Sequence, residues 1–323
     1  MVDDMARGRS DETAAERPDE AARVAVVRLE LPFSPERRGR PERERVVGWD
    51  SGRSLAYLQA LGREIAANAG QFPDVEVRAV RLGGGIATNA PAQALSEVYR
   101  ELSRVVRIAG DASITARASI HNISGASMPW MRRIGVGRFD FEMLSLDSVD
   151  FGRLNRVDSM ADLPYVEDSF LHAYAHDNLG FVLAYGYDAP DTTSFRRSVV
   201  AFTRSPASHL TLERWEGWRV PDGSDRPGRA SAALEAEQLG QARNVLAQAG
   251  FAEYAPLRFA RPGSEDRLTM LEAGGADVLS FGLGATTRFI GTVSTNTSDW
   301  ETYLAHSDDY AAITTDARPA GRE

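Results

Sequence analysis

Extended and helical patterns alternate along most of this 323-residue chain, and no other feature limits its fold so strongly. Short runs rich in β-branched residues predict strands, and segments with apolar residues at helical spacing follow them. Parallel strands need a crossover between them, so six such units predict a parallel sheet that forms a barrel or part of one. The predicted strands span residues 23–33, 75–82, 113–118, 137–144, 181–187 and 206–212, and the predicted helices 54–69, 91–105, 128–134 and 169–175.

Polar stretches divide the chain into regions. Residues 1–22 are charged and almost free of large apolar side chains, so we expect a disordered tail. A stretch rich in proline and glycine, residues 221–229, separates a barrel over residues 23–220 from a smaller C-terminal region over residues 221–312. Residues 313–323 are also polar, and we expect them to be disordered as well.

The chain contains no cysteine and no lysine, and all 37 basic residues are arginine. The first absence excludes thiolate nucleophiles, disulfides and iron–sulfur clusters held by the chain's own thiolates, and the second excludes Schiff-base chemistry on lysine. The net charge of −9 argues against a nucleic-acid-binding surface. No run of about 18 apolar residues predicts a membrane span, and the polar N-terminus lacks the apolar core of a signal peptide, so we expect a cytoplasmic protein.

Six short motifs occur in one order along the chain. They read RLELPFS at 28–34, GGGIAT at 83–88, GVGRFDFEMLS at 135–145, LNR at 154–156, YAPLRFARPG at 254–263 and FGLGA at 281–285. In order and spacing this series resembles the coproporphyrinogen dehydrogenase (HemN) and HemW-like branch of the radical S-adenosylmethionine (SAM) enzymes, over residues 24–310. The resemblance implies an α/β fold, an open (β/α)6 partial TIM barrel with a small C-terminal α+β extension.

The cluster-binding motif of that family is lost here. Its three cysteines fall on Ser34, Arg38 and Pro41, none of which supplies the thiolate that a [4Fe–4S] cluster needs. Without the cluster no electron reaches the sulfonium of SAM, so this chain cannot form a deoxyadenosyl radical on its own. We therefore expect a degenerate radical SAM site with no metal centre.

The resemblance also implies a SAM site. Of the features that form this site in the family, mainly the backbone contacts are retained here. In the family, the glycines at positions 83–85 approach the methionyl end of SAM closely, so Gly83, Gly84 and Gly85 are the candidate cofactor-binding residues. Glycines at such a turn are equally explained by tight packing of the chain itself. The side chains that would hold SAM in relatives are replaced here, so the sequence leaves SAM binding undecided. The replaced positions carry Arg28, Arg117, Leu144 and Ala255.

A charged cluster is the best candidate for a catalytic or binding site. Asp140 and Glu142 alternate with phenylalanines, so both carboxylates face one side of a strand. If that side is the barrel interior, Arg117 and Glu30 on neighbouring strands join them. Such a cluster is either an acid–base or binding site, or an internal ion-pair network that fills space once used by cofactor; we favour the second.

The histidines and serines give weaker signals. His172 and His176 stand four residues apart in a predicted helix and could ligate a metal, but no third ligand is evident, so a solvated or capping role is favoured. His209 matches a family strand and is better explained as a structural histidine than as a ligand-binding one. Ser34 and Ser145 lack a recognisable His–Asp arrangement, so no nucleophilic triad is predicted.

Five arginines interleave with glutamates between residues 37 and 45, in the segment that carries the cluster loop in relatives. The segment is either a docking site for an acidic partner or a carboxylate-bearing ligand, or a solvated loop; the solvated loop is favoured.

Three functions remain open. The first is a binding or accessory protein of a biosynthetic pathway, which holds a small molecule or assists a protein partner, either a genuine radical SAM homologue or another pathway enzyme. The second is a redox-neutral enzyme that binds SAM or another small molecule in the barrel. The third is a haem- or tetrapyrrole-handling protein. We favour them in that order, because cysteines and SAM-contacting side chains are lost together.

Overall fold

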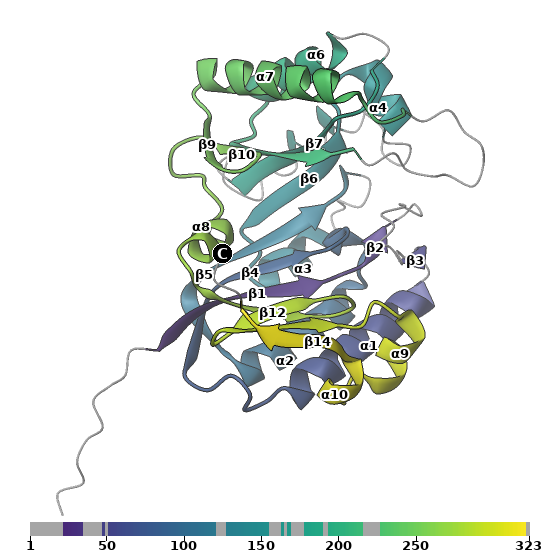
Figure 1. The fold of residues 1–323 in the computed structure, drawn as a ribbon, viewed down its shortest axis with the longest axis vertical. Helices are drawn as coiled ribbons and strands as arrows, with labels where there is room; N and C mark the ends of the chain where they lie inside the picture. The colour runs from purple at the N-terminus through teal and green to yellow at the C-terminus, as the bar shows by residue number, and fades with distance from the viewer. Residues whose placement is uncertain are drawn as a thin grey trace, which may run out of the picture.

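The computed structural model describes residues 22–34, 47–48, 51–120, 127–154, 163–164, 167–168, 178–189, 193–215 and 227–320 (Figure 1). Among these residues one twelve-stranded sheet dominates, and a two-stranded sheet joins β2 (Phe33–Ser34) to β3 (Val47–Gly48). Six central strands pair in parallel, as the sequence predicts. They are β1 (Arg23–Glu30), β4 (Val75–Gly83), β5 (Arg107–Ala118), β6 (Arg138–Leu144), β7 (Leu179–Tyr185) and β8 (His209–Arg214).

The crossover helices cover the outer face of this sheet. Figure 1 shows α1 and α2 beyond one half of the sheet, and α4, α6 and α7 beyond the other. In β1, Ala25, Val27 and Leu29 are fully buried in the core that these helices share, while the residues between them face the concave side, called the lumen below. The helices are α1 (Ser51–Ala67), α2 (Ala92–Val105), α3 (Ser127–Arg133), α4 (Ser148–Leu154), α6 (Ser194–Arg204) and α7 (Ala232–Gln248), with a 3-10 turn, η1 (Ala87–Asn89).

The elements after residue 227 extend both edges of the sheet. A hairpin of β9 (Ala252–Ala255) and β10 (Arg258–Ala260) pairs antiparallel with β8. On the far edge, β11 (Asp277–Phe281) lies parallel to β1, and β12 (Thr286–Phe289), β13 (Thr292–Asn296) and β14 (Thr314–Pro319) continue antiparallel. The predicted open partial barrel with a C-terminal α+β extension is confirmed, and the sheet does not close.

The expectation of a disordered segment from residue 313 is wrong for the strand β14. Ile313, at the end of α10 (Tyr310–Ile313), is fully buried and fixes the start of the strand. The exposed residues that follow pair along β13, from Thr314 with Asn296 to Pro319 with Thr292. Backbone pairing needs no large apolar side chains, which is why composition alone suggested disorder.

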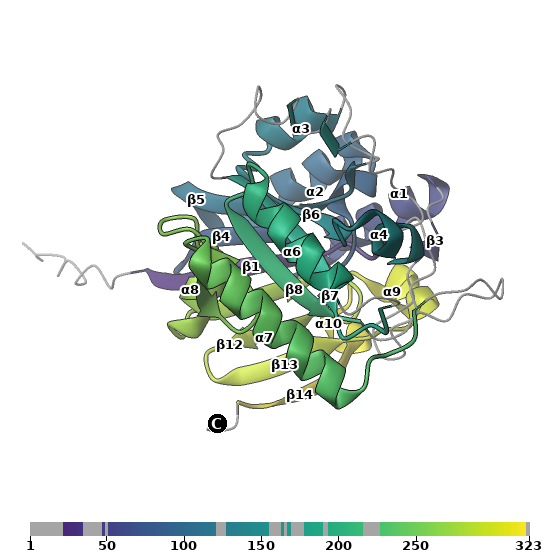
Figure 2. The same cartoon turned by 90° about the horizontal axis from the view of Figure 1, so that it is seen from above.

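One short helix, α8 (Arg267–Ala273), lies on the lumen side of β1 and β4 rather than on the outer face. Leu268 of α8 packs with Val26, Ala79 and Val278, which project inward from β1, β4 and β11. Seen from above, α8 lies beside the first strands of the sheet (Figure 2). The C-terminal region therefore fills part of the barrel interior itself.

A buried carboxylate ties the C-terminal strands to the first barrel helix. Glu64 of α1 accepts hydrogen bonds from Asn296 Nδ2 (2.6 Å), Tyr303 Oη (2.6 Å) and the backbone N of Gly282 (2.8 Å). Tyr303 belongs to α9 (Trp300–His306), so three C-terminal elements meet at one side chain. Burial raises the pKa of Glu64 to about 7, although these three hydrogen bonds act in the opposite direction.

Glu64 predicts an unusual pH dependence of stability. The folded chain holds the Glu64 proton up to about pH 7, whereas the unfolded chain releases it near the usual 4.5, so this group's contribution to stability falls as the pH rises between those values. Over this pH range the decline in the free energy of unfolding is on the order of 3 kcal/mol. We expect urea unfolding of Glu64→Gln to lack that decline, while Glu301→Gln, at an exposed position of α9, keeps it. The same decline in both variants would contradict the assignment.

Candidate functional site

The inward-facing side chains of the parallel strands form two polar rows across the lumen. Alternate residues point to the same face and the strands are in register, so charged residues far apart in sequence become neighbours. The lower row runs from Arg28 and Arg81 to Thr115 and Arg138, on β1, β4, β5 and β6. The next row holds Glu30, Gly83, Arg117, Asp140, Gly180 and His209.

Residues of both rows line a cavity of about 240 Å³. Small-molecule sites in proteins usually span roughly 300–1,000 Å³, so this one suits a small ligand. Its charged lining carries both signs: the arginines are Arg28, Arg81, Arg117 and Arg258, and the carboxylates are Glu30, Asp140 and Glu213. Arginine stays protonated and the other polar side chains among the described lining residues are threonines, so these residues offer charge and hydrogen bonds but no thiol, amine, imidazole or phenol.

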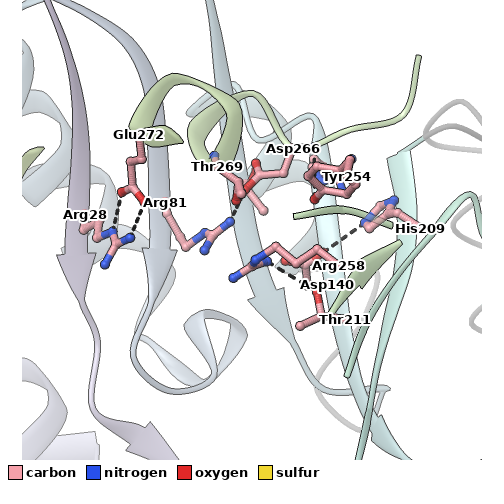
Figure 3. Close-up of polar contacts among 12 residues, drawn as sticks. Arg28, Arg81, Asp140, His209, Thr211, Tyr254, Arg258, Asp266, Thr269 and Glu272 are labelled. Atoms are coloured by element: carbon pink, nitrogen blue, oxygen red, sulfur yellow. Dashed lines mark hydrogen bonds and ion pairs between the residues drawn. The ribbon is translucent and has the colours of Figure 1, made fainter. Parts of the chain in front are cut away.

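The lower row is held by α8 (Figure 3). Arg81 forms an ion pair with Asp266, the N-cap residue of α8, and Arg28 donates Nε and Nη2 to the carboxylate of Glu272 (2.8 and 2.5 Å). Burial disfavours the charged form of Asp266, but Arg81, Arg138 and the hydrogen bond from Thr269 together outweigh this, so the pKa of the carboxyl is lowered. These two pairs fix α8 across the base of the cavity.

The predicted cluster of charges forms around Arg117. Arg117 Nε lies 2.9 Å from Glu142 Oε2, and its two Nη atoms lie 2.5 and 2.8 Å from the carboxylate of Glu213 on β8. Burial works against the charged guanidinium, yet Glu213 raises the pKa of Arg117. Glu142 is buried, so Arg117 serves chiefly to compensate internal carboxylates, in agreement with the ion-pair interpretation.

Asp140 has a different partner from Glu142, although both lie on β6. Its Oδ1 lies 2.9 Å from His209 Nε2, and His209 Nδ1 lies 3.1 Å from Ser208 Oγ. Burial lowers the pKa of His209, so the imidazole is neutral, donates from Nε2 to Asp140 and accepts from Ser208. Burial raises the pKa of Asp140, but the His209 hydrogen bond and nearby arginines outweigh it, so the pKa is lowered and the carboxylate stays ionised. His209 therefore positions Asp140, in a structural role.

The glycine turn after β4 packs against the chain itself. A Cβ at Gly85 would lie 2.5 Å from the carbonyl oxygen of Phe33 and 2.6 Å from that of Leu31, and one at Gly84 would collide with the Glu30 carboxylate. Gly83 O accepts a hydrogen bond from Leu31 N (2.5 Å). At Gly84 and Gly85 the close approach is thus explained by Glu30 and the segment that follows β1, which favours the packing interpretation there. A Cβ at Gly83 would meet the Arg81 side chain at 3.4 Å and no backbone atom of the described residues within 4 Å.

The remaining sequence candidates within the described residues are Glu30 and two serines, of which Glu30 lines the cavity. Glu30 ends β1: its carbonyl accepts from Tyr57 Oη (2.6 Å) and its side chain reaches the lining. Ser145 Oγ lies 3.3 Å from Ser198 Oγ. Ser34 ends β2. Four further candidates, Arg38, Pro41, His172 and His176, and the arginine-rich segment 37–45 lie outside the described residues.

Sequence reasoning missed five residues that shape the site: Arg81, Glu213, Arg258, Asp266 and Glu272. Arg81 and Glu213 face inward on the same strands as the candidates Gly83 and His209, so strand alternation could have identified these two. Nothing local in the sequence indicates that α8 enters the lumen.

Comparisons with known proteins agree with this fold. The structure aligns with the coproporphyrinogen III oxidase HemN of Escherichia coli, a radical SAM enzyme, with a TM-score of 0.78 and 17% identity over 93% of this chain and 72% of that one. The chain is 26% identical over 225 residues to the mitochondrial radical S-adenosyl methionine domain-containing protein 1 of Bos taurus, covering 66% of this chain and 49% of the relative. It is 24% identical over 225 residues to the oxygen-independent coproporphyrinogen III oxidase of Bradyrhizobium diazoefficiens, covering 64% and 47%.

The predicted resemblance to the HemN-like branch of the radical SAM enzymes is therefore confirmed. The chain has the HemN-like α/β fold, but its match spans about half the length of the curated relatives. No family model matches the chain. No helix in the described ranges is long and apolar enough to cross a membrane.

The iron–sulfur cluster that the fold implies does not fit these residues. A [4Fe–4S] cluster needs thiolates, and the chain has no cysteine. Over the described ranges no group of three histidine, aspartate or glutamate side chains could hold a metal ion. For SAM the space is restricted, because the backbone of Leu31 and Phe33 closes over Gly85 and the ion pairs of Arg117 and Arg81 occupy part of the lumen, leaving a cavity of about 240 Å³.

The contact between Gly180 and His209 gives a test of this site. A Cβ at position 180 would fall inside the imidazole of His209 on the neighbouring strand. We expect Gly180→Ala to destabilise the protein by about 3 kcal/mol, because neither strand can move apart. In a His209→Ala background the same substitution should cost less than about 1 kcal/mol. Urea unfolding measures both.

The matched control is Gly62→Ala in α1, where an added Cβ meets nothing within 4 Å. This change should leave stability unchanged or raise it slightly, by at most about 1 kcal/mol. Equal costs of Gly180→Ala in both backgrounds would contradict the packing of His209 over Gly180.

Proposed function

We propose that this chain is a non-radical binding protein that holds a small polar molecule in the lumen of a HemN-like barrel. The observation that carries the proposal is the cavity itself, in whose lining Arg28, Arg81 and Arg117 are positioned by ion pairs with the chain's own carboxylates. Because the chain lacks cysteine, electron transfer to SAM is not available to it alone.

The chemistry of the lining favours binding over catalysis. A general acid or base works best with a pKa near the working pH, and a nucleophile needs a neighbouring base. Asp140 is held ionised with a lowered pKa, and neutral His209 is buried behind it instead of facing the cavity. The redox-neutral enzyme is accordingly the weaker candidate.

Size argues against the tetrapyrrole-handling alternative. A cavity of about 240 Å³ lies below the usual range for drug-sized ligands, and a porphyrin macrocycle is larger than such ligands. Haem binding would also need an axial side chain, and no histidine or tyrosine is among the described residues that line the cavity.

In this proposal the protein acts as an accessory component of a biosynthetic pathway. A protein that binds a ligand without converting it either delivers the ligand to another protein or signals its presence to one. The protein partner that we infer is a cluster-bearing radical SAM homologue or another enzyme of the pathway, and the retained fold is the support for the first. No nucleic acid is expected as a partner, because the chain has a net charge of −9.

The test is equilibrium dialysis of the purified chain against a defined mixture of small polar metabolites, read by mass spectrometry. We expect at least one compound to be retained by the wild type and lost in Thr211→Trp and Val182→Phe, which fill the cavity from β8 and β7. Thr286→Trp, at an exposed position of β12, is the matched control and should retain the compound.

Titrations with SAM by calorimetry and with hemin by absorbance complete the test. We expect no heat of binding with SAM and no Soret shift with hemin. Micromolar SAM binding would favour the redox-neutral enzyme, and a Soret shift the tetrapyrrole-handling protein. Circular dichroism shows which of the cavity-filling variants fold. If a folded variant still retains every compound that the wild type retains, the binding site is not in the lumen.

A further inference from the structure

We propose that the ligand of this cavity is a small amino acid-like molecule, with a carboxylate bound by Arg258 and an ammonium bound by Asp140. This inference rests on the proposed binding function and specifies its ligand class. It follows from two opposite charges that line one cavity and that the chain leaves incompletely paired.

Among the described residues that line the cavity, Arg258 is the cation available to a ligand. Arg28, Arg81 and Arg117 are each bound to carboxylates of α8, β6 or β8. Within the described part of the chain, the hydrogen bond that Arg258 makes is to Thr211 Oγ1, at a long 3.4 Å, and it forms no ion pair. Its register opposite Thr211 on β8 places the guanidinium at the cavity wall, where a carboxylate can accept two parallel N–H donors.

Asp140 is the matching anion. His209 holds Oδ1, while Oδ2 accepts no hydrogen bond from any residue that the structure describes. The side chain is only 14% exposed and lines the same cavity as Arg258. Because its neighbours keep the carboxylate ionised, it presents a fixed negative charge to a ligand.

The geometry excludes a simple internal ion pair between these groups. Arg258 and Asp140 form no contact with each other within ion-pair distance, although both reach the space between α8 and β8 (Figure 3). A molecule that bears one charge of each sign can bridge them. A phosphate dianion is a poorer match, since Glu30, Asp140 and Glu213 share the lining.

The probes are the common L-amino acids and the ω-amino acids from β-alanine to 6-aminohexanoate, each at millimolar concentration. Thermal shift identifies those that bind, and calorimetry measures affinity. For the best probe, the amide without a carboxylate and the acid without an amine are titrated as well. We expect each of these analogues to bind about tenfold more weakly or worse.

Two substitutions assign the groups. Arg258→Gln should weaken the parent probe by about tenfold or more and remove the preference for it over its amide. Asp140→Asn should do the same for the preference over the deaminated acid. Arg288→Gln, at an exposed position of β12, is the matched control and should bind as the wild type does. The readout is the ratio of the affinities of one variant for two ligands. Partial destabilisation of the variant lowers both affinities and therefore leaves this ratio unchanged.

Three outcomes would overturn the inference: no probe binds, the deaminated acid binds as well as its parent, or both substitutions leave affinity unchanged. If dialysis still retains another small molecule in the cavity, the amino acid assignment falls and the binding function stands. If dialysis retains nothing either, both fall.

Discussion

The ion pair between Arg81 on β4 and Asp266 at the start of α8 is the contact on which the rest of the lumen depends. It joins the centre of the parallel sheet to a helix that enters the interior from the C-terminal region. Neither charge is tolerable in the interior without the other, because desolvating an unpaired ion costs several kcal/mol. With α8 in this position, Glu272 pairs with Arg28, and Leu268 packs against inward-facing residues of β1, β4 and β11. The lumen that remains is a small polar cavity.

This arrangement explains how a HemN-like fold can form without an iron–sulfur cluster, which the absence of cysteine excludes. The space inside the barrel must be filled, and the polar groups buried there need partners. Here the ion pairs of Arg117 and the Asp140–His209 contact fill it, at the cost of burying carboxylates. The other charged side chains leave the cavity lined by both positive and negative groups. In our proposal, this pattern of charges determines which ligand the cavity binds.

Much of the barrel could be predicted from the sequence, because alternation and helical spacing are local signals. The six parallel strands and the contact of Arg117 with Glu142 follow from them. The inward course of α8 and the edge strand β14 depend on distant partners, Arg81 and β13, that no local pattern shows. Asp140 could be placed on the inner face, but its pairing with His209 depends on Gly180, whose missing side chain admits the ring.

The most direct measurement is a double-mutant cycle on Arg81 and Asp266. Arg81→Met removes the cation, and Asp266→Asn removes the anion while keeping a side chain that can cap α8. Urea unfolding of the wild type, the single variants and the double variant gives their coupling energy. If this pair holds the lumen together, the coupling should be about 2 kcal/mol or more, and the double variant should be more stable than the sum of the single losses predicts. Additive losses, with coupling near zero, would contradict the account.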